Sequence, residues 1–180
     1  MELKILDNCC SLNYLNLIRK VALDSDNWNL RWPNNSIDKF LKLEIISNQQ
    51  AMNPLLSGLA MGLLCQIYDA GGQGLFIPNI HWCYIGMKDE VTKDNLHVDH
   101  IELPPNFVKI VGLINDDWKE EYGGNFFYKE TSNYMKPTSF YVFDPREWHK
   151  STKILTDKKR FAIDFTVDKI PEHLREIGWE

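Results

Sequence analysis

The residues with the most evident capacity for chemistry lie in the stretch DNLHVDH, residues 94–100, which holds two of the chain's five histidines. On a β-strand, side chains at positions i and i+2 point the same way, about 6–7 Å apart along the backbone. His97 and Asp99 can therefore converge on one metal ion, whereas His100 faces the opposite side of such a strand. An HxD pair is also common in loops that bind no metal, so further ligands have to support this interpretation.

A third ligand has to come from elsewhere, and the remaining histidines are His81, His149 and His173. His149 follows a predicted strand and tight turn in SFYVFDPREWHKS, whereas His173 lies in a stretch typical of a surface helix or tail. His81 precedes the HxD segment in an apolar run. Together with His97 and Asp99, His149 would form the two-histidine, one-carboxylate triad that holds Fe(II) on one face and leaves positions open. The absence of cysteine ligands makes structural zinc less favoured.

Arg160 is a further candidate, because it begins the alternating stretch RFAIDFTV. A buried guanidinium needs a partner, and its geometry suits a carboxylate. That carboxylate could belong to a co-substrate or to an internal acid such as Asp164. Arg160 could also simply end the basic turn that Lys158 and Lys159 begin.

Helical patterns dominate before residue 75. Ser11 can cap a helix over residues 12–22, and a third helix is predicted from Pro54 to about residue 68. Between them Ser36 can cap a second helix, whose predicted buried stripe is formed by Ile37, Phe40, Leu41 and Ile45.

Strand patterns dominate after residue 75, and turn formers separate the segments. The predicted strands are residues 80–87, 95–99, 107–114, 125–128, 139–143 and 160–167, with a short one around residue 149. We expect a mostly β fold with N-terminal helices: a β-sandwich or jelly roll buttressed by α-helices. It would form a single domain over residues 1–180, with a helical buttress (1–74), a jelly-roll core (75–168) and a C-terminal tail (169–180). In the last strand, one face of alternating apolar residues would pack against helices, and the other would look into the barrel mouth.

Composition narrows the possible partners. The net charge of −5 and the isoelectric point near 5.5 argue against nucleic-acid binding, which needs a concentrated basic surface. We find no signal-peptide pattern and no apolar run of membrane-spanning length, and the four cysteines form no CxxC. These features favour a cytoplasmic protein with reduced thiols and no membrane partner. The oligomeric state cannot be read from the sequence.

Taken in order, four stretches resemble the 2-oxoglutarate and Fe(II)-dependent dioxygenases, in particular their prolyl-4-hydroxylase-like branch. These stretches are HVDH, VGLINDDWKEEYGGNFFY, KPTSFYVFDPREWHKS and KRFAIDF, and the resemblance covers about residues 80–167. It implies that His97, Asp99 and His149 bind iron and that Arg160 holds the distal carboxylate of 2-oxoglutarate. Many family members carry Ser or Thr two residues after the basic anchor, but this chain has Ala162, and Tyr84 resembles the family tyrosine that often supplies the second hydroxyl contact.

The resemblance implies that the fold is a double-stranded β-helix, a cupin-like jelly roll buttressed by α-helices. It also implies a hydroxylase that uses Fe(II), 2-oxoglutarate and O2, with ascorbate as an optional further cofactor. It would hydroxylate a C–H bond of a small molecule or a peptidyl, for example prolyl, substrate and release succinate and CO2. The alternative is a non-redox cupin-like metal-binding protein, either an isomerase or hydrolase or a ligand-binding sensor. Such a protein would need no anchor at Arg160.

Overall fold

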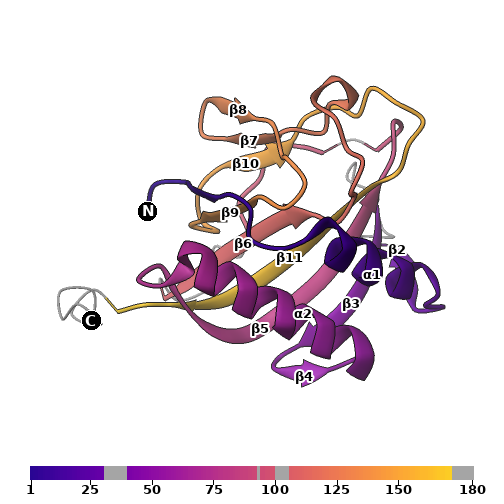
Figure 1. The fold of residues 1–180 in the computed structure, drawn as a ribbon. Coiled ribbons are helices and arrows are strands. Elements are labelled where there is room, and N and C mark those ends of the chain that lie inside the picture. The colour runs from indigo at the N-terminus through magenta and orange to yellow at the C-terminus, as the bar shows by residue number, and fades with distance from the viewer. Residues whose placement is uncertain (31–39, 93, 100–105, 172–180) are drawn as a thin grey trace.

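The computed structural model describes residues 1–30, 40–92, 94–99 and 106–171 (Figure 1). Two α-helices, a π-helical turn (Tyr68–Gly72) and a 3-10 turn (Glu120–Tyr122) accompany the strands in this part of the chain. The helices are α1 (Leu12–Leu23) and α2 (Pro54–Ile67). The strands are β1 (Lys4–Leu6), β2 (Trp28–Leu30), β3 (Leu41–Ser47), β4 (Gln50–Ala51), β5 (Phe76–Lys88), β6 (Phe107–Leu113), β7 (Phe126–Tyr128), β8 (Thr131–Asn133), β9 (Phe140–Phe143), β10 (His149–Ser151) and β11 (Arg160–Lys169).

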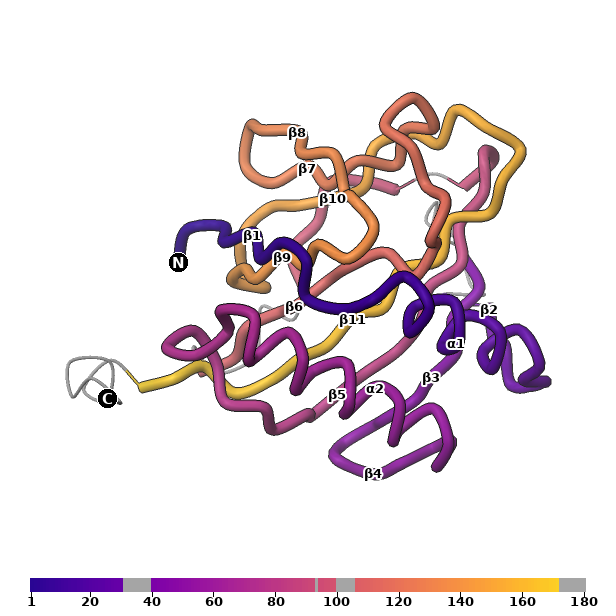
Figure 2. The backbone as a smooth tube through the Cα atoms, viewed as in Figure 1, coloured from indigo at the N-terminus to yellow at the C-terminus, as the bar shows by residue number. Residues whose placement is uncertain are grey.

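The strands form two antiparallel sheets. The large sheet has the order β1-β9-β6-β11-β5-β3-β2, with β4 paired to β3, and the small sheet has the order β10-β7-β8. Figure 2 shows the chain passing repeatedly between the two sheets, so that neighbours in space are often distant in sequence. Strand β11 lies at the centre of the large sheet, between β5 and β6.

Both helices pack against one face of the large sheet, which we call the outer face (Figure 1). Ser11 caps α1 by accepting a hydrogen bond from the backbone of Tyr14, and Asn53 caps α2 in the same way, with Pro54 in its first turn. The main core therefore lies between the helices and the outer face. Its members from β11 are Phe161, Ile163, Phe165 and Val167.

The opposite face of the large sheet, the inner face, meets the small sheet. A second apolar cluster joins Tyr141 and Phe143 of β9 to Phe126 and Tyr128 of β7. Because side chains alternate along a strand, the residues of β11 between the core positions point to the inner face. Arg160, Ala162 and Asp164 line a cavity there, as predicted.

The fold prediction is confirmed, since two antiparallel sheets are buttressed by helices. One predicted helix is wrong: residues 41–47 form β3. Leu41, Leu43 and Ile45 alternate with Lys42 and Glu44, and this period of two outweighs the helical spacing that we read.

Residues 95–99 do not form a regular strand either, and only His97 makes a β-bridge there. Residues 1–74 also hold β1 to β4 besides the two helices. Ser36, Ile37, His100 and His173, which the sequence patterns singled out, lie outside the described residues. Among the described helices, none is long and apolar enough to cross a membrane.

Candidate metal centre

A single antiparallel bridge places His97 against His149. The backbone N–H of His97 donates to the carbonyl of His149 at 3.0 Å, and the reverse hydrogen bond is 2.9 Å long. Their ring centroids lie 4.6 Å apart. Strand β10, which carries His149, is paired in turn with β7 of the small sheet. The backbone itself therefore brings the two histidines side by side.

Each imidazole is also oriented by a hydrogen bond to a nearby carbonyl. The Nδ1 atom of His97 lies 2.7 Å from the carbonyl oxygen of Asn95, and that of His149 lies 2.8 Å from the carbonyl oxygen of Glu147. A carbonyl oxygen only accepts, so Nδ1 must be the protonated nitrogen of each neutral ring. The Nε2 atom of each ring is then free to bind a metal ion.

Asp99 completes the group. Its backbone N–H donates to the carbonyl of Pro145 at 2.7 Å, which anchors it to the turn before His149. Its carboxylate oxygens lie 3.7 Å from His97 Nε2 and 3.4 Å from His149 Nε2. The three side chains offer ligand atoms that all lie within 4.8 Å of one another. This donor set of two imidazoles and one carboxylate suits Fe(II) and leaves coordination positions open.

The carboxylate of Asp99 is held in its anionic form although only 7% of the residue is exposed. Burial alone would raise its pKa. The positive charge of Lys109 is the largest effect that opposes burial, and it holds the pKa of Asp99 well below its usual range. The group therefore fits a divalent cation.

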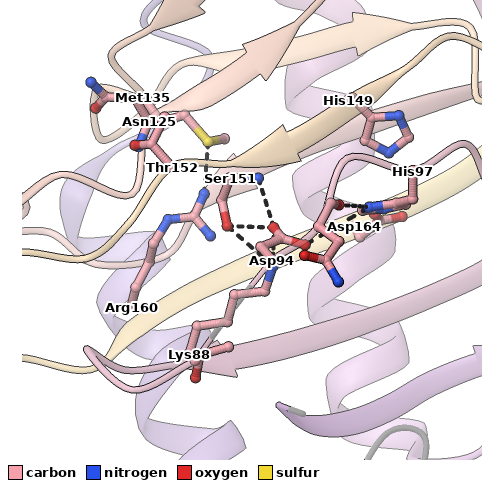
Figure 3. Close-up of polar contacts among 12 residues, drawn as sticks. Lys88, Asp94, His97, Asn125, Met135, His149, Ser151, Thr152, Arg160 and Asp164 are labelled. Atoms are coloured by element: carbon pink, nitrogen blue, oxygen red, sulfur yellow. Dashed lines mark hydrogen bonds and ion pairs between the residues drawn. The ribbon is translucent and has the colours of Figure 1, made fainter. Parts of the chain in front are cut away.

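A cavity of about 90 Å³ adjoins the three candidate ligands on the inner face. Besides them, its lining includes Lys88, Arg160 and two small residues, Gly86 and Ala162. These small residues lie opposite one another in the register of β5 and β11. The cavity thus extends from the candidate metal ligands to the charged residues at the ends of these two strands. Figure 3 shows Asp94 and Ser151 between the two histidines and Arg160.

Arg160 is 4% exposed and points into this cavity region from β11 (Figure 3). Its Nη2 atom contacts the Met135 sulfur at 2.9 Å, and its Nε atom is buried without a hydrogen-bond partner among the described residues. Burial lowers the pKa of Arg160 to about 10, with a partial offset from the charge of Asp94. The guanidinium is still positive at neutral pH, and a neutral thioether is a poor partner for it.

Neither Asp164 nor the basic turn accounts for the position of Arg160. Asp164 pairs with Lys109 at 2.5 Å and accepts a hydrogen bond from Tyr84. Lys158, from the preceding basic turn, is exposed and pairs with Asp117 instead. Arg160 therefore belongs neither to an ion pair with Asp164 nor to the solvated turn.

The glycine pair of the YGG motif has a specific role beside Arg160. Gly123 and Gly124 both adopt a φ of +68°, a conformation that favours glycine. A Cβ atom added to Gly124 would lie 2.7 Å from Cδ of Arg160. The turn is thus needed for more than chain reversal, because its backbone packs directly on the stem of the arginine.

Sequence reasoning missed a polar cluster at the end of the cavity. Lys88 contacts Asp94 and lies 3.2 Å from the Ser151 hydroxyl. Ser151 donates to Asp94 from both its hydroxyl and its backbone N–H (Figure 3). Asp94 was visible in the DNLHVDH motif, but the register that brings β5 and β10 beside it was not. Burial favours a higher pKa for Asp94, but the charge and hydrogen bond of Lys88 and the hydrogen bonds from Ser151 lower it to about 2.

Tyr84 lines the same cavity, although its hydroxyl donates to Asp164 at 3.0 Å. A phenolic oxygen can accept a second hydrogen bond, so a contact with a bound ligand stays a prediction. Trp148, next to His149, is 56% exposed and does not line the cavity.

No protein-family model and no curated protein matches the sequence. Solved structures do match the fold. A prolyl-4-hydroxylase from Pseudomonas putida aligns with a TM-score of 0.67 and 14% identity over 92% of this chain and 91% of that one. A viral collagen prolyl hydroxylase from Paramecium bursaria Chlorella virus 1, in complex with 2-oxoglutarate, aligns with a TM-score of 0.63 and 9% identity over 95% and 97% of the two chains.

A 2OG-Fe(II) oxygenase family oxidoreductase from Burkholderia pseudomallei aligns with a TM-score of 0.68 and 14% identity over 92% of this chain and 84% of that one. The chain therefore has the fold of the 2-oxoglutarate and Fe(II)-dependent oxygenases, including prolyl-4-hydroxylases. This confirms the resemblance at the level of the fold. What the site does follows from its residues.

Proposed function

We propose that the protein is an Fe(II)- and 2-oxoglutarate-dependent dioxygenase that hydroxylates a C–H bond of a small-molecule or peptidyl substrate. The observation that carries the proposal is one cavity with two complementary ends. At one end lie three metal-ligating side chains, His97, Asp99 and His149, and at the other lies the buried guanidinium of Arg160. A 2-oxo diacid has the matching chemistry, because one end chelates a metal and the other end is a carboxylate.

The iron and its bound co-substrates would supply the oxidation: one atom of O2 enters the substrate as hydroxyl, the other enters succinate, and CO2 leaves. The protein's residues would bind and orient the reactants. The imidazoles of His97 and His149 would ligate through Nε2, since their Nδ1 atoms face carbonyl oxygens. Arg160 would bind the distal carboxylate of 2-oxoglutarate, and the hydroxyl group of Tyr84 would make a second contact with the co-substrate. Gly86 and Ala162 have small side chains or none, and they leave room in the cavity for the carbon chain of 2-oxoglutarate.

A second cavity, of about 520 Å³, supports a site for the primary substrate. It shares Asp99 and Tyr84 with the first cavity and is also lined by Trp82, Lys42 and Glu44. Its size is that of a small-molecule pocket. Among the structural neighbours, a prolyl hydroxylase from Trichoplax adhaerens is described in complex with a peptide fragment, at 14% identity and a TM-score of 0.62. We accordingly include peptides among the candidate substrates.

The test is an anaerobic titration of the Fe(II)-loaded protein with 2-oxoglutarate, followed by a turnover assay. We expect a visible charge-transfer band from the chelate, and succinate release that a panel of free amino acids and prolyl peptides stimulates in air with ascorbate present. A non-redox metal-binding protein of the same fold would give neither signal. Absence of both the band and succinate from the iron-loaded protein would refute the proposed function.

A further inference from the structure

Lys109 is a buried cation next to the candidate metal centre. It lies on the inner face of β6 and is 2% exposed, although the residues around it in the sequence are apolar. Its Nζ atom lies 3.4 Å from Oδ2 of Asp99 and 2.5 Å from Oδ1 of Asp164. A buried lysine is costly unless it is well paired, so these contacts call for a physical reason.

Three adjacent strands hold this lysine in place. Asp164 of β11 lies opposite Tyr84 of β5 and Val111 of β6, one step along the inner face from Lys109. Its two carboxylate oxygens are divided between partners, because Oδ1 meets Lys109 and Oδ2 accepts the Tyr84 hydroxyl. The ammonium group is therefore fixed by the centre of the large sheet.

Asp99, by contrast, lies in a segment without regular secondary structure. Its backbone is tied by the hydrogen bond to Pro145, but its side chain needs a separate constraint. The contact with Lys109 engages Oδ2, while Oδ1 faces Nε2 of His97 at 3.7 Å. Oδ2 also lies 3.4 Å from Nε2 of His149. The ammonium group therefore contacts the carboxylate on the side of His149 and holds it between the two imidazoles.

We propose that Lys109 is a positioning residue that orients the Asp99 carboxylate toward the metal between the two histidines, with Asp164 and Tyr84 holding the lysine in turn. The inference rests on the proposed function, since it assumes that Asp99 binds iron. Side chains that hydrogen-bond to a ligand fix its orientation, and their loss typically lowers metal affinity about 10- to 100-fold.

A purely structural role for Lys109 would be to neutralise Asp164 and nothing more. A variant that removes both charges separates the two roles. Lys109→Met with Asp164→Leu removes one positive and one negative charge, so the net charge near the metal does not change. A buried ion pair can often be replaced by apolar residues without loss of stability, so this double variant should fold. Urea unfolding and circular dichroism check that it does.

We expect the double variant to bind Fe(II) about 10- to 100-fold more weakly than the native protein under anaerobic conditions, with Mn(II) binding followed by electron paramagnetic resonance as a second readout. The matched control is Lys158→Met with Asp117→Leu, which removes an exposed ion pair of the same residue types and should leave metal affinity unchanged.

A folded double variant with native metal affinity would refute the positioning role of Lys109. It would leave the proposed function standing, because the native protein would still bind iron. A native protein that binds no Fe(II) would refute the proposed function and this inference together. The single Lys109→Met variant adds a further check. It should unfold at lower urea concentration than the double variant, because it leaves Asp164 buried without a cation.

Discussion

His97 and His149 are antiparallel bridge partners, and each donates its backbone N–H to the carbonyl of the other. The main chain therefore brings the two histidines side by side. Asp99 is tied to the same turn through Pro145. Hydrogen bonds to the carbonyls of Asn95 and Glu147 then orient the two rings, so the three candidate ligands are held close together.

Replacing any one of the three candidate ligands should abolish the proposed reaction. We expect His97→Ala, Asp99→Ala and His149→Ala each to lose substrate-stimulated succinate release and to bind Fe(II) at least about tenfold more weakly. His81→Gln is the control, since His81 pairs with Asp168 outside the centre. Full turnover by the Asp99→Ala protein would remove Asp99 from the ligand set.

Arg160→Gln should weaken 2-oxoglutarate binding while leaving iron in place. Loss of a hydrogen bond to a charged group costs about 1.5–3 kcal/mol, which corresponds to roughly 10- to 150-fold in affinity. The measurement is anaerobic titration of the charge-transfer band, with Fe(II) content determined separately. Arg19→Gln serves as the matched control, because Arg19 of α1 pairs with Asp116 and does not line the cavity. An unchanged 2-oxoglutarate affinity would place the anchor elsewhere.

A bulkier side chain in the proposed co-substrate cavity should also weaken 2-oxoglutarate binding, because it would occupy the space that the diacid needs. Ala162 lines a space of only about 90 Å³, so Ala162→Leu is expected to exclude 2-oxoglutarate or to raise its KM at least about tenfold. Ala162→Gly, which adds no volume, should bind it nearly normally. Native 2-oxoglutarate affinity in the leucine variant would show that the diacid binds in another place.

Phe165 tests the main core rather than the site. It is fully buried on the outer face of β11, and Phe165→Ala should destabilise the fold by about 3–5 kcal/mol. Val91→Ala, at a position that is 77% exposed, should change stability by less than about 0.5 kcal/mol. Urea denaturation curves give both values. A loss below about 1 kcal/mol for Phe165→Ala would mean that this core is not packed as described.

Acid stability should depend on the turn before His149. A hydrogen bond from Arg146, opposed by burial, lowers the pKa of Asp144 below its usual value of 3.8. A carboxyl whose pKa is lower in the folded state stabilises the fold above its unfolded pKa, and this contribution is lost as the pH falls through the folded pKa. Arg146→Gln should therefore reduce stability by about 0.5–1 kcal/mol at pH 7 and by much less near pH 3. An equal loss at both values, measured by urea unfolding, would contradict this assignment.

The alternation of apolar and polar residues, together with short motifs, made several strands and the candidate metal ligands predictable from the sequence. The pattern RFAIDFTV separates a core face from a cavity face, and the structure places Phe161 and Arg160 on those two faces. The HxD spacing and the distal histidine predicted a group that the structure brings together. Residues 41–47 were misread because a short amphipathic stretch satisfies both periods.

The charged network behind the centre could not be predicted in the same way. Asp164 was considered from the sequence only as a partner for Arg160, and its pairing with Lys109 arises from the register of β6 against β11. The Lys88–Asp94 contact likewise depends on how a strand end meets a segment without regular structure. Such contacts follow from tertiary packing, which periodicity along one strand does not encode.

Because Gly124 packs closely on the Arg160 stem, the shape of this turn and the position of the buried guanidinium depend on each other. An insertion or a bulkier side chain in this turn would push the arginine rather than merely rearrange the loop. Under the proposed function, engineering that reshapes the turn to admit new substrates would therefore alter co-substrate use first, with the candidate iron ligands left intact.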